Sequence, residues 1–404
     1  MDAVMDAEVD VVVVGGGPSG ATAAERLARE GHKVALLDKA GRIKPCGGAV
    51  PPRLIRDFAI PEELICAKIT SARMVSPTDR AVDMPIENGY VGMVDRDVFD
   101  EFLRKRAVAA GAMRVTGTYT ALERSKTGAP VVAYRTPQGE GRLTAKLVVG
   151  ADDARSKVAK DAMNGAITKS VFAYHEIIES PDDGPAFDGK RCEVYYQGKL
   201  SPDFYAWVFP HGRTASIGVG SAHKGFSLRG AVRDLRAASG LDTATTHRTE
   251  GAPIPLKPLK RWDNGRDVVV IGDAAGVVAP ASGEGIYYAM ASGEIAAEEV
   301  ANALATGSAK PLAAIRKRFM KAHGRVFMAL GVLQWFWYAN DKRRERFVTM
   351  CADKDVQQLT FDAYMNKELV RRKKAAHMRV FMKDVAHLLR IVRPVKHSDA
   401  PSSP

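Results

Sequence analysis

The segment 10–39, DVVVVGGGPSGATAAERLAREGHKVALLDK, constrains the fold more than any other part of the sequence. Residues 9–14 predict a buried parallel strand, residues 21–29 follow the period of an amphipathic helix, and residues 33–37 predict a second strand. The chain has 404 residues, 46% of them hydrophobic and 26% charged, which is ordinary for a globular protein with two lobes. The segment therefore predicts a βαβ unit of an α/β fold.

The glycines of this segment predict a dinucleotide site. Gly15 permits a tight turn, Gly17 lets the backbone approach a pyrophosphate, and Gly20 lets the helix pack closely on the strand. Asp38 ends the second strand, where a carboxylate can bond an unphosphorylated adenosine ribose. The pattern leaves FAD and NAD open, because the two cofactors share the adenosine diphosphate half. Further candidate contacts beside this turn are Pro18, Ser19 and Lys39.

Two later segments favour a flavin. Residues 143–150 predict a strand that ends in GADDARS, and residues 267–304 predict a strand, the turn GDAAG, a Pro/Gly loop and a long helix. This combination resembles the FAD-binding fold of the aromatic hydroxylases. The resemblance implies that Asp273 contacts the ribityl hydroxyls and that Gly285 and Ile286 lie beside the flavin ring. Asp153 stands where that family usually has a glycine.

The segment 90–112 carries further candidates. Asp97 is predicted to cap a helix whose apolar stripe includes Phe99 and Leu103. By resemblance, Arg96 contacts the cofactor, the alternative being an ordinary surface arginine. A strand at 118–122 is expected to run past the flavin, with Ala121 as a backbone contact.

Aromatic residues at strand period predict the substrate side. Tyr205, Trp207 and Phe209 project from one face of a strand, and Pro210 is expected to end it. Taken alone, these rings would be explained better by ordinary core packing of a second-domain sheet. Together with KPCGG at 44–48 and the later Gly218 and Gly220, however, they resemble the geranylgeranyl reductase family, most closely the branch that acts on bacteriochlorophyll and chlorophyll. Tyr205, Trp207, Phe209 and Pro210 are the candidate substrate contacts.

The resemblance implies an FAD-dependent enzyme that uses NADPH to saturate isolated C=C bonds of a geranylgeranyl chain, giving phytyl. The substrate would be a prenylated pigment or a prenyl diphosphate, and a pigment synthase is a possible partner class. The alternatives are an archaeal-type membrane-lipid reductase, a flavin monooxygenase, and a non-catalytic flavin or pigment carrier. No second GxGxxG follows a strand, so a nicotinamide is expected to visit a shared cleft.

The KPCGG loop has a predicted place in this chemistry. An alkene remote from any carbonyl accepts hydride only if a proton arrives first or with it, and a dry pocket keeps water from trapping the cation. Gly47 and Gly48 would let the backbone approach the flavin, which places Cys46 near the reacting atoms. A protonated thiol can relay a proton, so Cys46 is the candidate proton donor or positioning residue. The alternative is a small cofactor contact without a catalytic role.

Charge and composition bear on the remaining classes. From Lys310 to the end there are 21 Lys plus Arg against 8 Asp plus Glu, on a body that is otherwise about neutral. The aromatic run 326–340 and the basic amphipathic stretch 371–392 predict peripheral attachment to an anionic membrane on its cytoplasmic side, although the aromatic run could also close the substrate tunnel. No nucleic-acid motif, metal-ligand spacing or secretory signal is expected, and the four scattered cysteines indicate a reducing compartment.

The predicted organisation is an FAD-binding Rossmann-like domain of the aromatic-hydroxylase type with an inserted antiparallel-sheet substrate domain and a helical C-terminus. The FAD-binding parts are predicted at 1–75, 96–165 and 261–310, and the substrate-domain parts at 76–95 and 166–260. A helical basic region is predicted at 311–396 and a disordered tail at 397–404.

Overall fold

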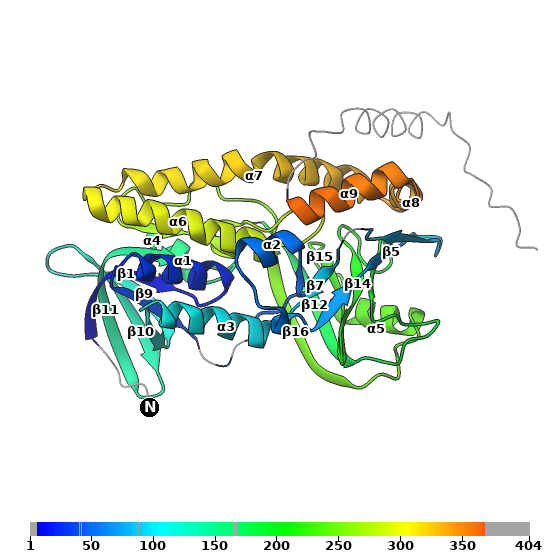
Figure 1. Cartoon of the computed structure of the whole chain (residues 1–404), viewed down its shortest axis with the longest axis horizontal. Helices are drawn as coiled ribbons and strands as arrows, with labels where there is room; N and C mark the ends of the chain where they lie inside the picture. The colour runs from blue at the N-terminus through cyan, green and yellow to red at the C-terminus, as the bar shows by residue number, and fades with distance from the viewer. Residues whose placement is uncertain (1–5, 40, 42, 88, 165–168, 368–404) are drawn as a thin grey trace, which may run out of the picture.

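A computed structural model describes residues 6–39, 41, 43–87, 89–164 and 169–367. The molecule is elongated, with two lobes side by side and two long helices laid across one face (Figure 1). The first lobe is built on the glycine-rich N-terminal unit, and the second on a sheet whose strands come from residues 71–85 and 170–255. The predicted mixed α/β class, with an inserted sheet lobe and helices toward the C-terminus, is confirmed.

The sheet of the first lobe has the order β8-β2-β1-β11-β10-β9, with β17 also paired to β11. Its central strands β1, β2 and β11 are parallel, and their residues 11–14, 34–37 and 147–150 are buried, as expected of runs of valine and leucine. The long β11 pairs with β10 through its first half and with β17 through its last residues. The strands are β1 (Asp6–Val14), β2 (Val34–Asp38), β8 (Met113–Thr116), β9 (Thr118–Arg124), β10 (Pro130–Thr136), β11 (Gly139–Gly150) and β17 (Val268–Val270).

The sheet of the second lobe has the order β16-β12-β15-β14-β13-β5-β6 and is antiparallel except for the β13–β5 pair. Its first strand comes from residue 71 onward, inside the segment predicted as the first FAD-binding part. The strands are β5 (Ser71–Val75), β6 (Ala81–Pro85), β12 (Ser170–Glu179), β13 (Arg191–Tyr195), β14 (Ala206–His211), β15 (Thr214–Ser221) and β16 (Thr246–Pro255). A small sheet between the lobes contains β3 (Ala49–Val50), β4 (Ala67–Ile69) and β7 (Val91–Met93).

The helices complete the two lobes. In Figure 1, α1 and α3 lie on the first lobe, α5 lies on the second, and α7 runs along both with α8 and α9 at its far end. The helices are α1 (Pro18–Arg29), α2 (Pro52–Asp57), α3 (Arg96–Ala109), α4 (Lys157–Ala162), α5 (Leu228–Ala238), α6 (Ile286–Thr306), α7 (Lys310–Trp337), α8 (Asp341–Met350) and α9 (Lys354–Asn366). The predicted basic stretch 371–392 and the tail 397–404 lie outside the described residues.

Two local predictions were wrong. Asp97 does not cap α3, because the helix begins at Arg96 with Asp95 in the N-cap position, and Asp97 falls in the first turn. Pro210 does not end β14, which continues through it and pairs it with Ala215 of β15. The proline is tolerated because the pairing of β14 with its other neighbour, β13, extends only as far as Val208, so no donor is needed on that side.

Candidate functional site

The glycine-rich turn between β1 and α1 is shaped by close backbone contacts. Gly15 has φ of 107°, and a Cβ there would lie 2.2 Å from the carbonyl oxygen of Ala151. A Cβ on Gly20 would lie 1.9 Å from the oxygen of Gly15, so this glycine serves the packing of helix on strand. Gly17, by contrast, faces open space and is the N-cap of α1, with no side-chain hydrogen bond to the helix end. The first-turn N–H groups are therefore left for a ligand.

Asp38 at the end of β2 holds the other side of this turn. Its Oδ1 accepts a hydrogen bond from the Gly16 N–H at 3.0 Å, and its Oδ2 lies 3.2 Å from a guanidinium nitrogen of Arg104. Arg104, which belongs to α3, also donates a hydrogen bond to the Gly16 carbonyl oxygen at 3.3 Å. The carboxylate predicted to meet a ribose is thus fixed in place by the turn and by an arginine that sequence reasoning missed.

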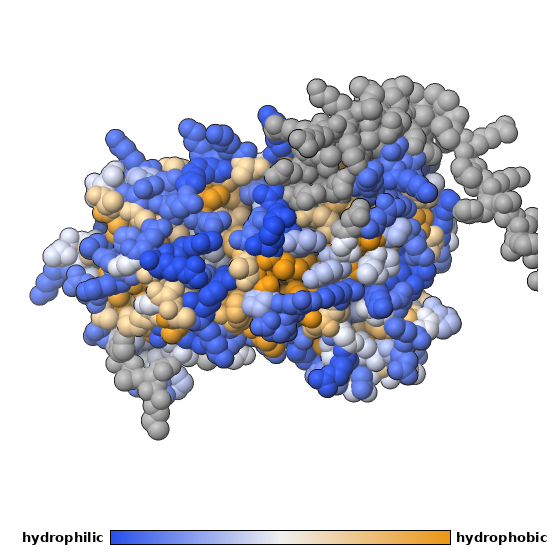
Figure 2. Space-filling view, in the orientation of Figure 1, coloured by the Kyte–Doolittle hydropathy of each residue, from blue (hydrophilic) through white to orange (hydrophobic). Residues whose placement is uncertain are grey.

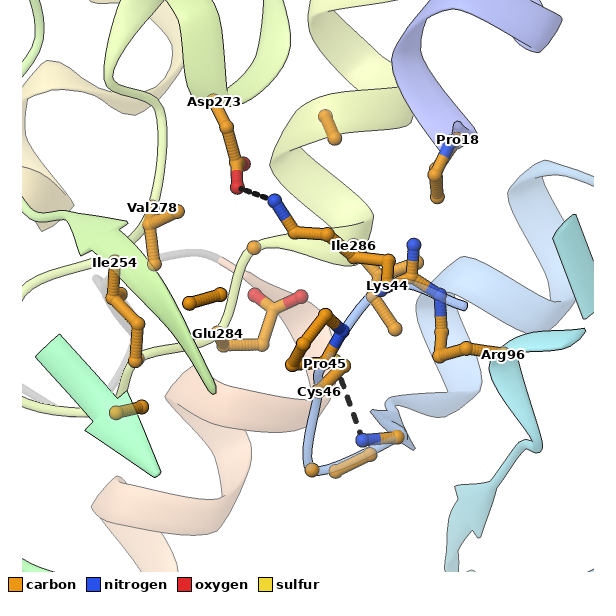
Figure 3. A pocket seen from close by; sticks show the side chains of 18 of the residues that line it. Pro18, Lys44, Pro45, Cys46, Arg96, Ile254, Asp273, Val278, Glu284 and Ile286 are labelled. Carbon is orange, nitrogen blue, oxygen red and sulfur yellow. Dashed lines mark hydrogen bonds and ion pairs between the residues drawn. The ribbon is translucent and has the colours of Figure 1, made fainter. Parts of the chain in front are cut away.

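A lysine and two carboxylates meet at the next part of the site. Lys44 Nζ lies 2.9 Å from Asp273 Oδ2 (Figure 3). It also contacts Asp153. Burial alone would lower the pKa of Lys44, but the charges of Asp273 and Asp153 raise it. The lysine of KPCGG therefore stays charged and joins the 44–48 loop to two turns of the first lobe.

The Asp153 backbone explains why a glycine is usual at its position in the aromatic hydroxylases. Its φ is 82°, in the left-handed region that side chains other than glycine rarely adopt. The side chain compensates, because Oδ1 accepts a hydrogen bond from the Ala154 N–H at 2.7 Å and contacts Lys44. The aspartate is thus a local replacement with its own stabilising contacts.

The KPCGG loop packs against the second lobe. A Cβ on Gly47 would lie 3.0 Å from the Phe209 ring, and one on Gly48, where φ is 71°, would lie 2.5 Å from His211 Nε2. Cys46 is half-buried, and its Sγ accepts a weak hydrogen bond from the Gly48 N–H at 3.4 Å. The two glycines therefore allow the loop to lie between both lobes, with the cysteine on its inner side.

Arg96, the first residue of α3, faces the same sulfur. It is buried and forms a bidentate pair with Asp100, both contacts being 2.8 Å. Burial opposes its charge, but Asp100 and the neighbouring Cys46 keep the pKa of Arg96 above its usual value. The alternative of an ordinary surface arginine does not fit this burial.

Tyr205 and Trp207 are fixed by hydrogen bonds. The Tyr205 hydroxyl donates to the Ser282 carbonyl at 2.6 Å, which ties the second sheet to the loop before α6. Trp207 Nε1 donates to Ser216 Oγ at 3.1 Å, and His175 Nδ1 lies 2.9 Å from the same oxygen. The polar atom of each ring is thus engaged, so the rings present mainly carbon.

Most of the predicted site residues border one continuous cavity of about 690 Å³ that runs from the glycine-rich turn to the aromatic rings. Its volume is in the range of cofactor and substrate sites. Gly20, Ala121 and Pro210 do not line it, whereas Thr118 and Tyr119 of the same strand as Ala121 do. The predicted residues on its wall are Gly15, Gly17, Pro18, Ser19, Asp38, Lys39, Cys46, Gly47, Gly48, Arg96, Tyr205, Trp207, Phe209, Asp273, Gly285 and Ile286.

The first half of this cavity fits an FAD. The uncapped N–H groups in the first turn of α1 suit a pyrophosphate, Asp38 suits a ribose hydroxyl, and Asp273 suits the hydroxyls of a ribityl chain. Gly285, the N-cap of α6, also lacks a side-chain hydrogen bond and opens toward the cavity. These are features of backbone and charge that a purely structural turn does not need.

Comparisons with known proteins decide the family. The FAD binding domain family matches residues 8–318. The geranylgeranyl diphosphate reductase of Rhodobacter capsulatus is 55% identical over 95% of this chain and 98% of its own length. The chain belongs to the geranylgeranyl reductase family. It is therefore a flavin-dependent oxidoreductase.

Two further relatives place the reductase in a wider group. The digeranylgeranylglycerophospholipid reductase of Methanocaldococcus jannaschii is 30% identical over 79% of this chain and 84% of its own length. The crystal structure of a geranylgeranyl bacteriochlorophyll reductase-like protein from Thermoplasma acidophilum has a TM-score of 0.79 at 22% identity, covering 92% of this chain and all of that one. The latter shows that the fold is shared.

Several cavity residues of the reductase were not predicted. Lys44 lies in the KPCGG motif and Glu284 lies in the Pro/Gly loop before α6, and in both places a charged residue close to glycines was a signal. Tyr196, Tyr338 and Tyr364 come from three distant segments, and no spacing in the sequence connects them. Their shared cavity is a consequence of the tertiary fold alone.

Proposed function

We propose that this reductase saturates isolated C=C bonds of a geranylgeranyl chain, carried on a diphosphate or on a bacteriochlorophyll-type pigment, with electrons from NADPH. The observation that carries the proposal is the continuity of the cavity. The cradle that fits FAD opens directly onto a wall formed by Tyr205, Trp207 and Phe209. An extended hydrocarbon on that wall would lie against the cofactor without leaving the protein.

The lining suits the chemistry of an unactivated alkene. FAD, when bound and reduced, supplies the hydride. The protein must exclude nucleophiles, and the Tyr205 and Tyr338 hydroxyls both donate to backbone carbonyls, at 2.6 and 3.1 Å. Aromatic faces also stabilise the positive charge that develops as the proton arrives. The chain's contribution is thus to orient the alkene and to keep water from it.

In this proposal Cys46 contacts both the bound FAD and the prenyl chain. Its sulfur lines the cavity between the Gly48 N–H and the buried Arg96. Both neighbours are hydrogen-bond donors, so the sulfur is held as an acceptor. This geometry favours a positioning role for Cys46 over the predicted role as proton donor.

NADPH is proposed to reach the same cavity from solvent. The described residues contain one glycine-rich turn of the dinucleotide type, that of Gly15 to Gly20, and we assign this turn to FAD. A nicotinamide would therefore share this cavity, whose lining includes Arg155 and Lys157. Their positive charges suit a nucleotide phosphate.

Peripheral attachment to an anionic membrane is proposed through α7. Met328, Val332 and Trp335 are 68%, 58% and 75% exposed and recur every three to four residues, so they share one face of the helix. Leu330 and Leu333, between them in sequence, line the cavity instead. One helix would thus separate a lipid surface from the substrate chamber. Within the described residues, no helix combines the length and apolarity needed to cross a bilayer.

Figure 2 shows hydrophilic side chains over most of one face, with apolar side chains gathered near its middle, where the lobes meet, apart from α7. Basic side chains occur on α8, the helix that follows α7, among them Lys342, Arg343 and Arg346. Aromatic and aliphatic groups beside lysine and arginine are typical of interfacial attachment.

The test is an anaerobic reaction with NADPH in which geranylgeranyl diphosphate and a geranylgeranyl-bearing pigment are offered separately. Mass spectrometry should find products heavier by successive pairs of hydrogens with at least one of them. An archaeal-type lipid substrate forms a third arm, and the 55% against 30% identities favour the first two. A product that gains oxygen in air would instead show a monooxygenase, and no turnover in any arm would show a carrier.

A further inference from the structure

A buried acid and a buried lysine meet where the loop before α6 approaches the end of α9. Glu284 Oε2 and Lys367 Nζ are 2.8 Å apart, with side chains only 5% and 3% exposed. Glu284 Oε1 accepts a hydrogen bond from the Tyr287 N–H at 2.9 Å, which fixes the carboxylate at the start of α6. The lysine ammonium lies 3.9 Å from the ring centre of Tyr364 and 5.7 Å from that of Tyr288.

The carboxylate belongs to the substrate end of the cavity. Glu284 and Tyr364 both line it, and Figure 3 shows the Glu284 carboxylate projecting in the direction of Pro45. A Cβ on the adjacent Gly283 would lie 3.1 Å from the Tyr205 hydroxyl and 3.2 Å from the Phe204 ring. The acid therefore stands where the cofactor loop meets the aromatic wall.

The other ionisable groups at this end are poorly suited to give up a proton. Burial raises the pKa of Tyr205 and of Tyr338, and both hydroxyls are already bonded to carbonyls. The Cys46 sulfur faces hydrogen-bond donors, and a thiol is intrinsically a weaker acid than a carboxyl group. His175 has both ring nitrogens engaged, by Ser216 and Glu250.

We propose that Glu284 gives the proton to the alkene and that Lys367 restores it, an assignment that rests on the proposed function. In the reaction, the π bond is lost, one C–H bond forms with the carboxyl proton and the other with hydride from reduced FAD. The electron pair comes ultimately from NADPH. The carboxyl proton is the one that Glu284 takes from the Lys367 ammonium when the chain fills the cavity, and after the alkene has received it the neutral amine takes a proton from water and restores the ion pair.

The environment of the pair favours this exchange. Burial lowers the pKa of Lys367, against the attraction of Glu284. The groups that face the pair are Arg53 of α2, Tyr288 of α6 and Tyr364 of α9, and of these only Arg53 is positively charged, which further opposes the ammonium. Filling the cavity with hydrocarbon removes remaining water, which disfavours the ion pair relative to a neutral carboxyl and amine.

The test mixes reduced holoprotein anaerobically with geranylgeranyl diphosphate or the pigment and follows flavin reoxidation at saturating substrate. Glu284→Gln keeps the hydrogen bond from Tyr287 but has no acid proton, so its rate should fall by about 100-fold or more. FAD content and the rate of flavin reduction by NADPH should match the wild type. Glu294→Gln, at a partly exposed glutamate of α6 that pairs with Arg26, is the matched control and should react normally.

Lys367→Met gives an independent readout, which also decides the matter if Glu284→Gln is recovered without FAD. In the wild type, Glu284 and Lys367 together retain one proton until the pH exceeds the pKa of the lysine. In the variant that proton can be held only by Glu284. The high-pH limb of the reoxidation rate should therefore move to lower pH. Superimposable pH profiles, or a Gln variant that is impaired only in substrate affinity, would overturn the assignment. A wild-type protein that no prenyl substrate reoxidises would instead overturn the proposed function.

Discussion

The Trp207 ring lies over Gly218 on the neighbouring strand, so closely that a Cβ on Gly218 would be 2.3 Å from Trp207 Cζ2. Two residues further along β15, a Cβ on Gly220 would be 2.6 Å from the Phe204 ring. The Trp207 and Phe204 rings therefore pack against Gly218 and Gly220, where a side chain would clash. This packing explains why the aromatic strand is followed by glycines in the sequence.

The first prediction concerns the packing of the Trp207 ring on Gly218. Gly218→Ala should displace the Trp207 ring into the cavity and destabilise the fold by about 1–3 kcal/mol, as overpacking of a core does. Denaturant unfolding measures this change in the free energy of unfolding. Gly184→Ala is the control, because its nearest neighbour would lie 4.0 Å away. Equal stability of the two variants would contradict the packing described here.

The second prediction concerns the four cysteines. Burial raises the pKa of Cys66 and of Cys351 to about 12, and raises that of Cys192 as well. These thiols should resist alkylation at pH 8, whereas Cys46, half-buried on the cavity wall, should react in the apoprotein. Bound FAD should protect it. Peptide mass mapping after iodoacetamide treatment checks this, and labelling of Cys46 that FAD does not slow would argue against the cofactor assignment.

The third prediction concerns acid stability near the cofactor turn. Hydrogen bonds from Arg114, aided by Arg104, hold the pKa of Glu101 at about 2 despite partial burial. Because the folded pKa lies below the unfolded value, the stabilisation is present at neutral pH and is lost as pH falls from about 4 toward 2. Glu101→Gln should thus cost about 1 kcal/mol at pH 7, after allowance for solvent screening.

Urea unfolding of the wild type and of Glu101→Gln at pH 7 and at pH 3 measures this difference. The gap between the two proteins should narrow as the solution is acidified. A gap that stays constant with pH would mean that the carboxylate's charge is not what stabilises this end of α3.

The fourth prediction concerns α7. Trp335→Ser together with Val332→Ser should weaken sedimentation with vesicles that contain anionic lipid, because both side chains are more than half exposed. Val98→Ser is the matched control, since Val98 is 55% exposed on α3, away from the basic helices. Unchanged binding by the double variant would exclude this face as the attachment surface. Equal binding to vesicles with and without anionic lipid would contradict the role given to the basic side chains.

The sequence allowed the first lobe to be predicted well because its signals are local. The strand, glycine turn, helix and terminal Asp38 are consecutive, and each residue type is required by backbone geometry or by charge. The aromatic strand was also found from its period. Its continuation through Pro210 was not, because tolerance of that proline depends on where the neighbouring β13 stops pairing.

The site residues that the sequence did not reveal were missed for a different reason. Glu284 meets Lys367, and Lys44 meets Asp153 and Asp273, across separations of dozens to hundreds of residues. Such pairs are created by the packing of α9 and of the 44–48 loop, and a single sequence carries no periodic signal for them. The sequence indicates which residue types are available, and the fold decides which of them face one another.

The account's central claim is that the cofactor cradle and the aromatic wall form one chamber in which reduced FAD meets an alkene. The most direct measurement is an anaerobic titration of chemically reduced holoprotein with geranylgeranyl substrate, followed by flavin absorbance and product mass. We predict one flavin reoxidised for each C=C bond lost, with a gain of two hydrogens in the product. A flavin that stays reduced with every prenyl substrate until oxygen is admitted would contradict the claim.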